Sequence, residues 1–309
     1  MFPRYPDNPM RRTDSQERLS HVAGSGQARP LNGTARRSGL TLVELLVASA
    51  IMVLIVGALG VLAKAVQMGA QYSGGHGEAI QHARVTLERI TRIANEATTS
   101  QTFPGILTLA TTAGGNSYPD TLVVWHPDDA PADPARLTPR FNELVIFCAS
   151  LEQPNELIQL TAPGDTRPVP EYTDQSVWRA AVESLRQSDV TRQIVMTNLV
   201  RTASADGSGL PSSLRPCVRF NVRLRPSETQ LTAYENGTYS NDEAKEEAWK
   251  EIPWVQNIYS PSLGLRQVWL RIELQLTPGD AAQENATGEE TAIPFLDSAT
   301  VYYSVNKAN

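Results

Sequence analysis

Cysteine and histidine are scarce in this sequence of 309 residues, which has two cysteines and four histidines. It contains no C-x-x-C pair, and His126, the one histidine after residue 100, has no cysteine or histidine near it. Zinc needs such side chains in closely spaced groups. Asp128-Asp129 and Asp206-Gly207-Ser208-Gly209 do not have the spacing of a calcium-binding EF-hand. We therefore expect solvated acidic loops and no metal site.

Catalytic motifs are also missing. The sequence has no G-x-S-x-G, no P-loop and no dinucleotide-binding fingerprint, and it has no pair of histidines in a metalloprotease pattern. These absences predict a protein that is not an enzyme and that binds no cofactor.

Charged side chains are absent from residues 45–63, within an apolar run that covers about residues 40–66. As a helix rising about 1.5 Å per residue, residues 40–63 measure about 36 Å, enough to cross a bilayer core of roughly 30 Å. Arg36 and Arg37 precede the run, and cations in this position stay on the cytoplasmic side. The run predicts a single membrane span with the C-terminal part of the chain outside the cytoplasm.

Glu44 is the one carboxylate inside this run. A carboxylate within a membrane span costs several kcal/mol unless it is paired or neutralised, so such residues are functional candidates. The alternative is that Glu44 lies at the cytoplasmic interface and reaches the lipid headgroups. We favour a functional role, because a glutamate without a use would be an unusual choice in an otherwise apolar stretch.

The residues from Arg36 to Ala48 read RRSGLTLVELLVA. This segment resembles the N-terminal signature of type IV pilins and of type II secretion pseudopilins. In that family a basic leader ends in glycine, a prepilin peptidase cuts after the glycine and methylates the new N-terminus, and the fifth mature residue is glutamate. The resemblance implies cleavage between Gly39 and Leu40, N-methylation of Leu40, and a role for Glu44 in assembly.

The same resemblance implies the partners: the prepilin peptidase, the inner membrane, and other pilins or pseudopilins of one filament. There Glu44 would pair with the free amine of a neighbouring subunit, since opposite charges attract strongly in a low dielectric. Two features depart from the common pattern. The first mature residue is usually phenylalanine and here is Leu40, and the leader is long, so Met10 is an alternative start to Met1.

Residues 1–39 contain seven arginines and three acidic residues, a net charge of +4, and their removal takes the chain from −6 to −10. They have no apolar periodicity, which is typical of a basic leader without a fold of its own. Because the remaining chain is acidic, we predict no nucleic-acid partner. A DNA-uptake machine stays an alternative to secretion or a pilus, because natural competence systems also use pilins and charge alone does not exclude that pathway.

Two ordinary membrane signals are alternatives. Ala63-Lys64-Ala65 has the small-x-small pattern of a signal peptidase site, and cleavage there would release the chain from Val66 onward. An uncut signal anchor is the second alternative. Both are disfavoured, because the apolar run is longer than the 7–15 residues of a secretory signal core and contains Glu44.

A second helix is predicted over residues 78–98, because apolar residues recur there at steps of three and four. They are Ile80, Ala83, Leu87, Ile90, Ala94 and Ala97. Glycines between this stripe and the membrane span predict a point where the helix bends or locally melts. They are Gly69, Gly74, Gly75 and Gly77.

After residue 100 the pattern changes to short β-type runs separated by proline, glycine and asparagine. The predicted strands are residues 121–126, 143–149, 156–161, 193–200, 217–224, 267–277 and 299–305. Two of them alternate apolar and polar residues, which is typical of an antiparallel sheet with one solvated face. Two helical inserts are predicted: a stripe of Val177, Ala181, Val182 and Leu185 after Asp174, and residues 244–250 after the capping box Ser240-Asn241-Asp242-Glu243.

Cys148 and Cys217 both fall in predicted strands. In an oxidising compartment an even number of cysteines favours a disulfide, which here would close a loop of about 70 residues and stabilise by roughly 3–4 kcal/mol. The alternative is two buried thiols, because free cysteine packs as a small hydrophobic side chain. The sequence leaves the two alternatives open.

The sequence therefore predicts an α+β protein in four parts. They are a cleaved leader (1–39), a transmembrane and assembly helix (40–66), a juxtamembrane amphipathic helix (67–98) and a β-rich extracytoplasmic domain (99–309). The order of strands and the size resemble J-type minor pseudopilins and W-type minor pilins. We expect a minor subunit of a type II secretion pseudopilus or a type IV pilus in the inner membrane. The alternative is an anchored or secreted β-rich binding protein with no part in assembly.

Overall fold

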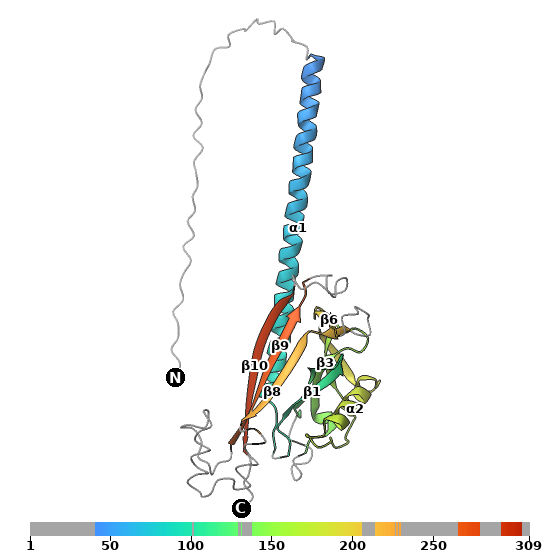
Figure 1. Ribbon diagram of the computed structural model, residues 1–309, viewed down its shortest axis with the longest axis vertical. Helices are drawn as coiled ribbons and strands as arrows, with labels where there is room; N and C mark the ends of the chain where they lie inside the picture. The colour runs from blue at the N-terminus through green and yellow to red at the C-terminus, as the bar shows by residue number, and fades with distance from the viewer. Residues whose placement is uncertain are drawn as a thin grey trace, which may run out of the picture. The chain divides into compact units, whose positions relative to one another are not determined.

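The computed structural model describes residues 41–100, 102–128, 131, 138–205, 214–225, 227, 229, 265–278 and 292–304. In this part of the chain one long helix, α1 (Leu42–Asn95), precedes a set of strands and a second helix, α2 (Gln175–Arg186) (Figure 1). Every strand pairing between named strands in these residues is antiparallel. The predicted α+β class is confirmed. The leader and the predicted helix 244–250 with its capping box lie outside the described residues.

The chain divides into two compact units, Met1–Gly60 and Val61–Asn309. The two helices predicted on either side of residue 66 are one helix, because α1 continues without a break through Gly69, Gly74 and Gly77. The predicted local melting at these glycines is therefore wrong. Glycine costs about 1 kcal/mol relative to alanine inside a helix, and the turns that follow these glycines are fixed by packing.

The packed part of α1 carries a stripe of small and branched side chains. It consists of Ala79, Ala83, Thr86, Leu87, Ile90, Ile93 and Ala94, all buried. This confirms most of the predicted stripe, but Ile80 remains 50% exposed. Each helical residue turns by about 100°, so Ile80 lies past the edge of the stripe that Ala79 and Ala83 define.

The first sheet has five strands in chain order: β1 (Ile106–Ala113), β2 (Asn116–Trp125), β3 (Leu144–Ala149), β4 (Leu157–Thr161) and β5 (Arg192–Thr197). The predictions for residues 121–126, 143–149, 156–161 and 193–200 are confirmed as β2 to β5, with shifted ends. A short 3-10 helix, η1 (Phe141–Glu143), precedes β3. Strand β1 was not predicted.

A two-residue turn explains β1. Gly114 and Gly115, with φ of 56° and 79°, join β1 to β2, and a Gly-Gly pair is a strong signal for a hairpin. Strand β2 begins five residues before its predicted start, and it includes Pro119. The pairing register shifts between Leu109 and Thr111, opposite this proline, and such irregularities are where strands tolerate proline.

The second sheet has the strand order β10-β9-β8, formed by β8 (Val218–Arg225), β9 (Leu265–Leu276) and β10 (Ile293–Ser304). The predictions for residues 217–224, 267–277 and 299–305 are confirmed, although β10 begins six residues early and residue 305 lies outside the described residues. Pro294 lies in β10, an edge strand of this sheet, and an edge strand accepts proline. A third pair, β6 (Thr202–Ser204) with β7 (Leu214–Pro216), was not predicted.

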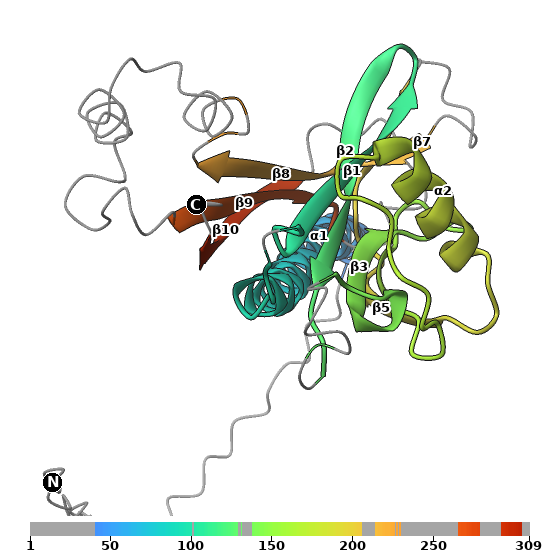
Figure 2. The same ribbon diagram turned by 90° about the horizontal axis from the view of Figure 1, so that it is seen from below.

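Two cores lie on opposite faces of the five-stranded sheet. In β2, Leu122 and Val124 belong to the first core, while Val123 and Trp125 belong to the second. The first core joins this face to the stripe of α1 and to the three-stranded sheet, and Figure 2 shows α1 end-on between the sheets. The second core lies under α2.

Main-chain hydrogen bonds connect the two sheets. Arg201 donates its N–H to Gln275 O at 2.9 Å, and Thr277 donates its N–H to Leu199 O at 2.8 Å. Cys217 donates its N–H to Arg201 O at 2.7 Å. The segment after β5 thus pairs with the end of β9. This pairing holds the five-stranded sheet in a defined position along the three-stranded sheet.

Helix α1 is also hydrogen-bonded to both sheets. Arg89 Nε donates to Gln159 Oε1 on β4 at 2.7 Å, and His82 Nδ1 and Thr197 Oγ1 share a hydrogen bond of 3.1 Å. On the other side, Thr91 Oγ1 donates to Asp297 Oδ2 on β10 at 2.8 Å. These bonds fix the rotation of α1 as well as its position.

Helix α2 confirms the first predicted insert. Asp174 caps it by accepting a hydrogen bond from Val177 N at 3.2 Å. Trp178, Val182 and Leu185 face the second core, whereas Val177, predicted to be buried, is 47% exposed. Trp178, missed in the sequence, follows the same helical spacing and is completely buried.

Gly105 lies where the chain leaves α1 for β1. Its φ is +81°, and a Cβ at this position would lie 2.5 Å from Thr98 O and 2.7 Å from Thr99 Cγ2. Gly115 has a similar φ of +79°, but a Cβ there would meet nothing within 4 Å.

We predict that Gly105→Ala destabilises the protein more than Gly115→Ala. A left-handed backbone costs about 1–2 kcal/mol for a residue with a Cβ, and only Gly105→Ala adds a clash with main chain. The measurement is thermal unfolding of the full chain in neutral detergent, where each kcal/mol shifts the midpoint by roughly 2–4 °C. Equal shifts for the two variants would contradict the steric argument.

Candidate functional site

The N-terminal turn of α1 contains Glu44 in a reciprocal set of hydrogen bonds. Thr41 donates to Glu44 Oε2 through its N–H at 2.9 Å and through Oγ1 at 3.1 Å, and Glu44 N donates to Thr41 Oγ1 at 3.3 Å. Leu45 N donates to Thr41 O at 3.2 Å, so Thr41 is the N-cap residue. This is a capping box. The Thr-x-x-Glu spacing in the sequence is its signal.

The capping box gives Glu44 a local role in starting the helix. Both bonds from Thr41 reach Oε2, and within the part of the chain that the structure describes no donor reaches Oε1. The side chain therefore retains an oxygen that can accept a hydrogen bond from another molecule. Gly39 and Leu40, the predicted cleavage and methylation positions, lie outside the described residues.

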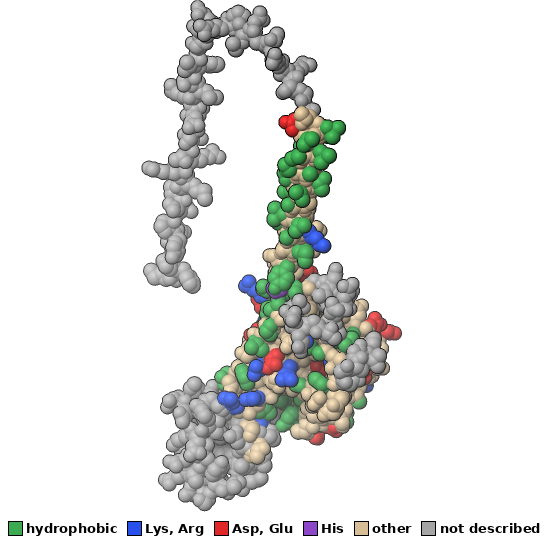
Figure 3. Space-filling model, turned by 45° about the horizontal axis from the view of Figure 1, so that its top comes forward, with side chains coloured by type: hydrophobic (Ala, Val, Ile, Leu, Met, Phe, Trp, Pro, Cys, Tyr) green, Lys and Arg blue, Asp and Glu red, His purple; other side chains and the backbone are tan. Residues whose placement is uncertain are grey.

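Apolar side chains surround the helix after Glu44. Leu45, Leu54 and Leu62 are exposed, as is every other residue of α1 from Leu42 to Tyr72. Figure 3 shows hydrophobic side chains along this part of the helix. Among the described residues α1 is the one helix long and apolar enough to cross a membrane. This is coarse support for a single-pass anchor.

The two cysteines are free thiols in the structure. Cys148 is buried in β3 within the second core, under α2, and Cys217 is half-buried between β7 and β8. Burial raises the pKa of Cys148 to about 11 and also raises the pKa of Cys217. Of the two alternatives, the structure contains the thiols and not the disulfide.

We predict that maleimide labels Cys217 slowly and Cys148 only after unfolding, because a thiolate is the reactive form and both thiols stay protonated at neutral pH. The labelling rate of Cys217 should rise with pH. The measurement is mass spectrometry of the native full chain in detergent, with Cys217→Ser as the control that removes native labelling. A Cys148–Cys217 peptide found without reduction would contradict the prediction.

Metal-binding positions are not assembled in the described residues, where no group of three or more potential ligands lies together. His126 Nε2 lies 3.2 Å from Glu96 Oε2 at the surface. Asp129 and residues 206–209 are outside the described residues, so the structure tests neither acidic motif in full.

A polar cluster missed in the sequence lies between β2 and the end of α2. Asp120 is buried and accepts a hydrogen bond of 2.6 Å from Thr111 Oγ1. Burial raises the pKa of Asp120, and the threonine partly offsets this effect. Arg186 pairs with Glu183 at 3.2 Å and donates to Ala149 O at 2.5 Å. The bond from Arg186 to Ala149 O fastens the end of α2 to β3.

No protein-family model, curated protein or solved structure matches this chain. The residues and their geometry therefore carry the functional argument.

Proposed function

We propose that this chain is a minor pilin or pseudopilin subunit that is anchored by α1 in the inner membrane and assembles with similar subunits into a short filament. The observation that carries the proposal is an exposed apolar helix whose first turn holds a carboxylate, directly after a basic segment ending in glycine. The N-terminal resemblance supports it, and the machine could be a secretion pseudopilus or a pilus.

The exposed helix needs an apolar environment. Each large apolar side chain loses about 1.5–3 kcal/mol when it remains in water instead of being buried. From Leu45 to Ala63 no charged side chain offsets this cost. A bilayer meets the requirement before assembly, and the helices of neighbouring subunits would meet it in a filament.

Small residues on this helix favour close helix contacts. A Cβ added at Gly57 or Gly60 would meet no atom within 4 Å, so these positions are open to a partner. Glycine and alanine let helix backbones approach closely in membranes. In the proposed filament Glu44 would lie among such helices, where its unpartnered Oε1 would accept from the amine of Leu40 of another subunit.

We predict that a prepilin peptidase removes residues 1–39. Glycine has no side chain at the scissile position, so Gly39→Leu should block cleavage, while Gly33→Leu within the leader should not. The measurement is mass spectrometry of the N-terminus of protein from the native membrane. N-methylated Leu40 is expected; a start at Val66 would indicate ordinary signal peptidase and refute the proposal.

We predict that the charge of Glu44, and not its capping bond, is needed for assembly. Glu44→Gln can keep a capping box, because glutamine also serves at this position, but it loses the charge. Thr41→Ala keeps the charge and loses the cap, at about 1 kcal/mol. Leaving a neighbour's amine buried and unpaired costs about 3–5 kcal/mol, a factor of hundreds or more in association.

The measurement is recovery of each variant with cross-linked filament subunits, at matched cleavage and membrane levels. Glu44→Gln and Glu44→Ala should both be lost from the filament, and Thr41→Ala should be retained. The opposite pattern would show that helix capping is the function of Glu44. Normal assembly of all three variants would remove this turn from the mechanism.

A further inference from the structure

The three-stranded sheet has one face in the first core and one face outside it. Phe220 on β8 is completely buried in that core. Successive side chains of a strand point to opposite faces, so Arg219 and Arg223 point outward. The register places them opposite Glu273 and Trp269 of β9. We call the outward side of β8, β9 and β10 the arginine face.

The arginine face is basic. Arg219, Arg223 and Arg225 of β8 and Arg271 of β9 lie on it. Glu273 is the single carboxylate that the described residues of these strands place there, so they give the face a net charge of +3, on a chain whose net charge is −6. The side chains of Arg219 and Arg271 are 55% and 47% exposed, and the other two arginines are exposed as well. Figure 3 shows cationic side chains gathered on the lower part of the molecule.

Two of these four arginines have no carboxylate partner among the residues that the structure describes. Glu273 is shared by Arg271, at 2.8 Å, and Arg219, at 3.9 Å. Within the described ranges no carboxylate pairs with Arg223 or Arg225. Exposed and uncompensated arginines in a row attract a polyanion.

The spacing of the row fits a linear polyanion. Alternate residues of a strand lie about 6.8 Å apart, so the row from Arg219 to Arg225 spans about 20 Å. An extended phosphodiester chain presents its charges one after another along such a line. Guanidinium groups bind phosphate oxygens in a bidentate manner.

Two aromatic side chains, Trp269 and Tyr302, lie on the same side of the sheet as this row of arginines. The guanidinium carbon of Arg223 lies 5.8 Å from the centre of the Trp269 ring, which is half-buried. Tyr302 of β10 is 49% exposed on the same side and accepts a hydrogen bond from Gln267 Nε2 at 3.1 Å. Unpaired bases stack on aromatic rings and on guanidinium planes.

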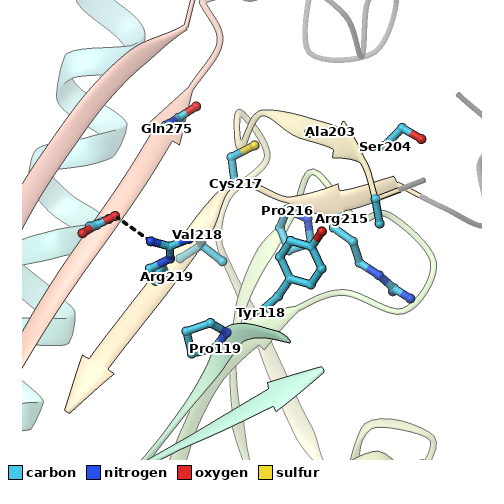
Figure 4. A pocket seen from close by; sticks show the side chains of 12 residues that line it. Tyr118, Pro119, Ala203, Ser204, Arg215, Pro216, Cys217, Val218, Arg219 and Gln275 are labelled. Atoms are coloured by element: carbon cyan, nitrogen blue, oxygen red, sulfur yellow. Dashed lines mark ion pairs between the residues drawn. The ribbon is translucent and has the colours of Figure 1, made fainter. Parts of the chain in front are cut away.

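A cavity lies at the Arg219 end of the row. Its volume is about 360 Å³, within the size range of small-ligand pockets, and Tyr118, Arg215 and Arg219 contribute to its lining. Figure 4 shows Tyr118 and Arg215 side by side at this cavity, with Arg219 nearby in its ion pair. Tyr118 offers a ring for one base at the end of the row, and Arg215 offers a cation for its phosphate. Glu273, which also lines the cavity, pairs with Arg219.

We propose that the arginine face binds single-stranded nucleic acid, with phosphates on the arginines and bases stacked against Trp269 and in the cavity. The inference rests on the sheet alone and does not depend on the proposed assembly role. The acidic net charge of the chain, which argued against a nucleic-acid partner, does not describe this face.

The first test is fluorescence anisotropy of a labelled oligothymidylate with the full chain in neutral detergent, over a range of salt concentrations. Arg223→Gln with Arg225→Gln should weaken binding roughly tenfold or more and lower the salt slope by about 1.4, or 0.7 for each lost phosphate contact. The matched control is Arg179→Gln with Arg192→Gln, exposed arginines on α2 and β5. Equal effects of the two pairs would overturn the proposal.

The second test separates bases from charge. Trp269→Leu should weaken oligothymidylate binding by roughly fivefold or more without changing the salt slope, and it should leave polyphosphate binding unchanged. A circular dichroism melt checks that Trp269→Leu folds. If it does not fold, the variant with Arg223→Gln and Arg225→Gln tests the proposal instead. Polyphosphate bound as tightly as the oligonucleotide, or anionic phosphatidylglycerol vesicles bound in its place, would overturn the proposal.

Discussion

The burial of one stripe of α1 is the constraint on which the folded unit depends. Ala79, Ala83, Ile90 and Ala94 are completely buried in a core that also contains the inner faces of both sheets. Burial of apolar surface stabilises a fold by about 25 cal/mol per Å². In this core α1, the five-stranded sheet and the three-stranded sheet bury such surface against one another. Removing the helix would therefore expose both sheets at once.

The same helix changes its character along its length. From Ala79 onward one stripe of small and branched side chains is buried, whereas the turns from Leu45 to Gly60 are exposed and carry no charged side chain. A helix that is apolar all round belongs in lipid or among other helices. Glu44 and Thr41 satisfy two of the N–H groups at this helix end within the chain itself, which lowers the cost of beginning the helix in such surroundings.

The sequence predicted the elements whose signal is local. The apolar runs of β2 and β3 and the alternation in β8 and β9 predicted strands correctly. A strand buried on both faces is apolar throughout, and a strand buried on one face alternates apolar with polar residues. The Gly114-Gly115 turn was a local signal that was overlooked. The alternation also predicted a solvated polar face on these strands. It could not show that Arg223 meets Trp269 there, because this contact depends on the pairing of strands far apart in sequence. The glycines of α1 led to a wrong prediction of local melting, because packing further along α1 outweighs the low helix propensity of glycine.

The hydrogen bonds of α1 have a mechanical consequence. Arg89 ties the helix to β4, while Thr91 and Asn95 tie it to β10, where Thr300 N donates to Asn95 Oδ1 at 3.1 Å. These three residues lie within two turns of one another. A pull along the helix axis would therefore load both sheets in parallel, and the main-chain joint between residues 199–201 and β9 would keep them from shearing apart.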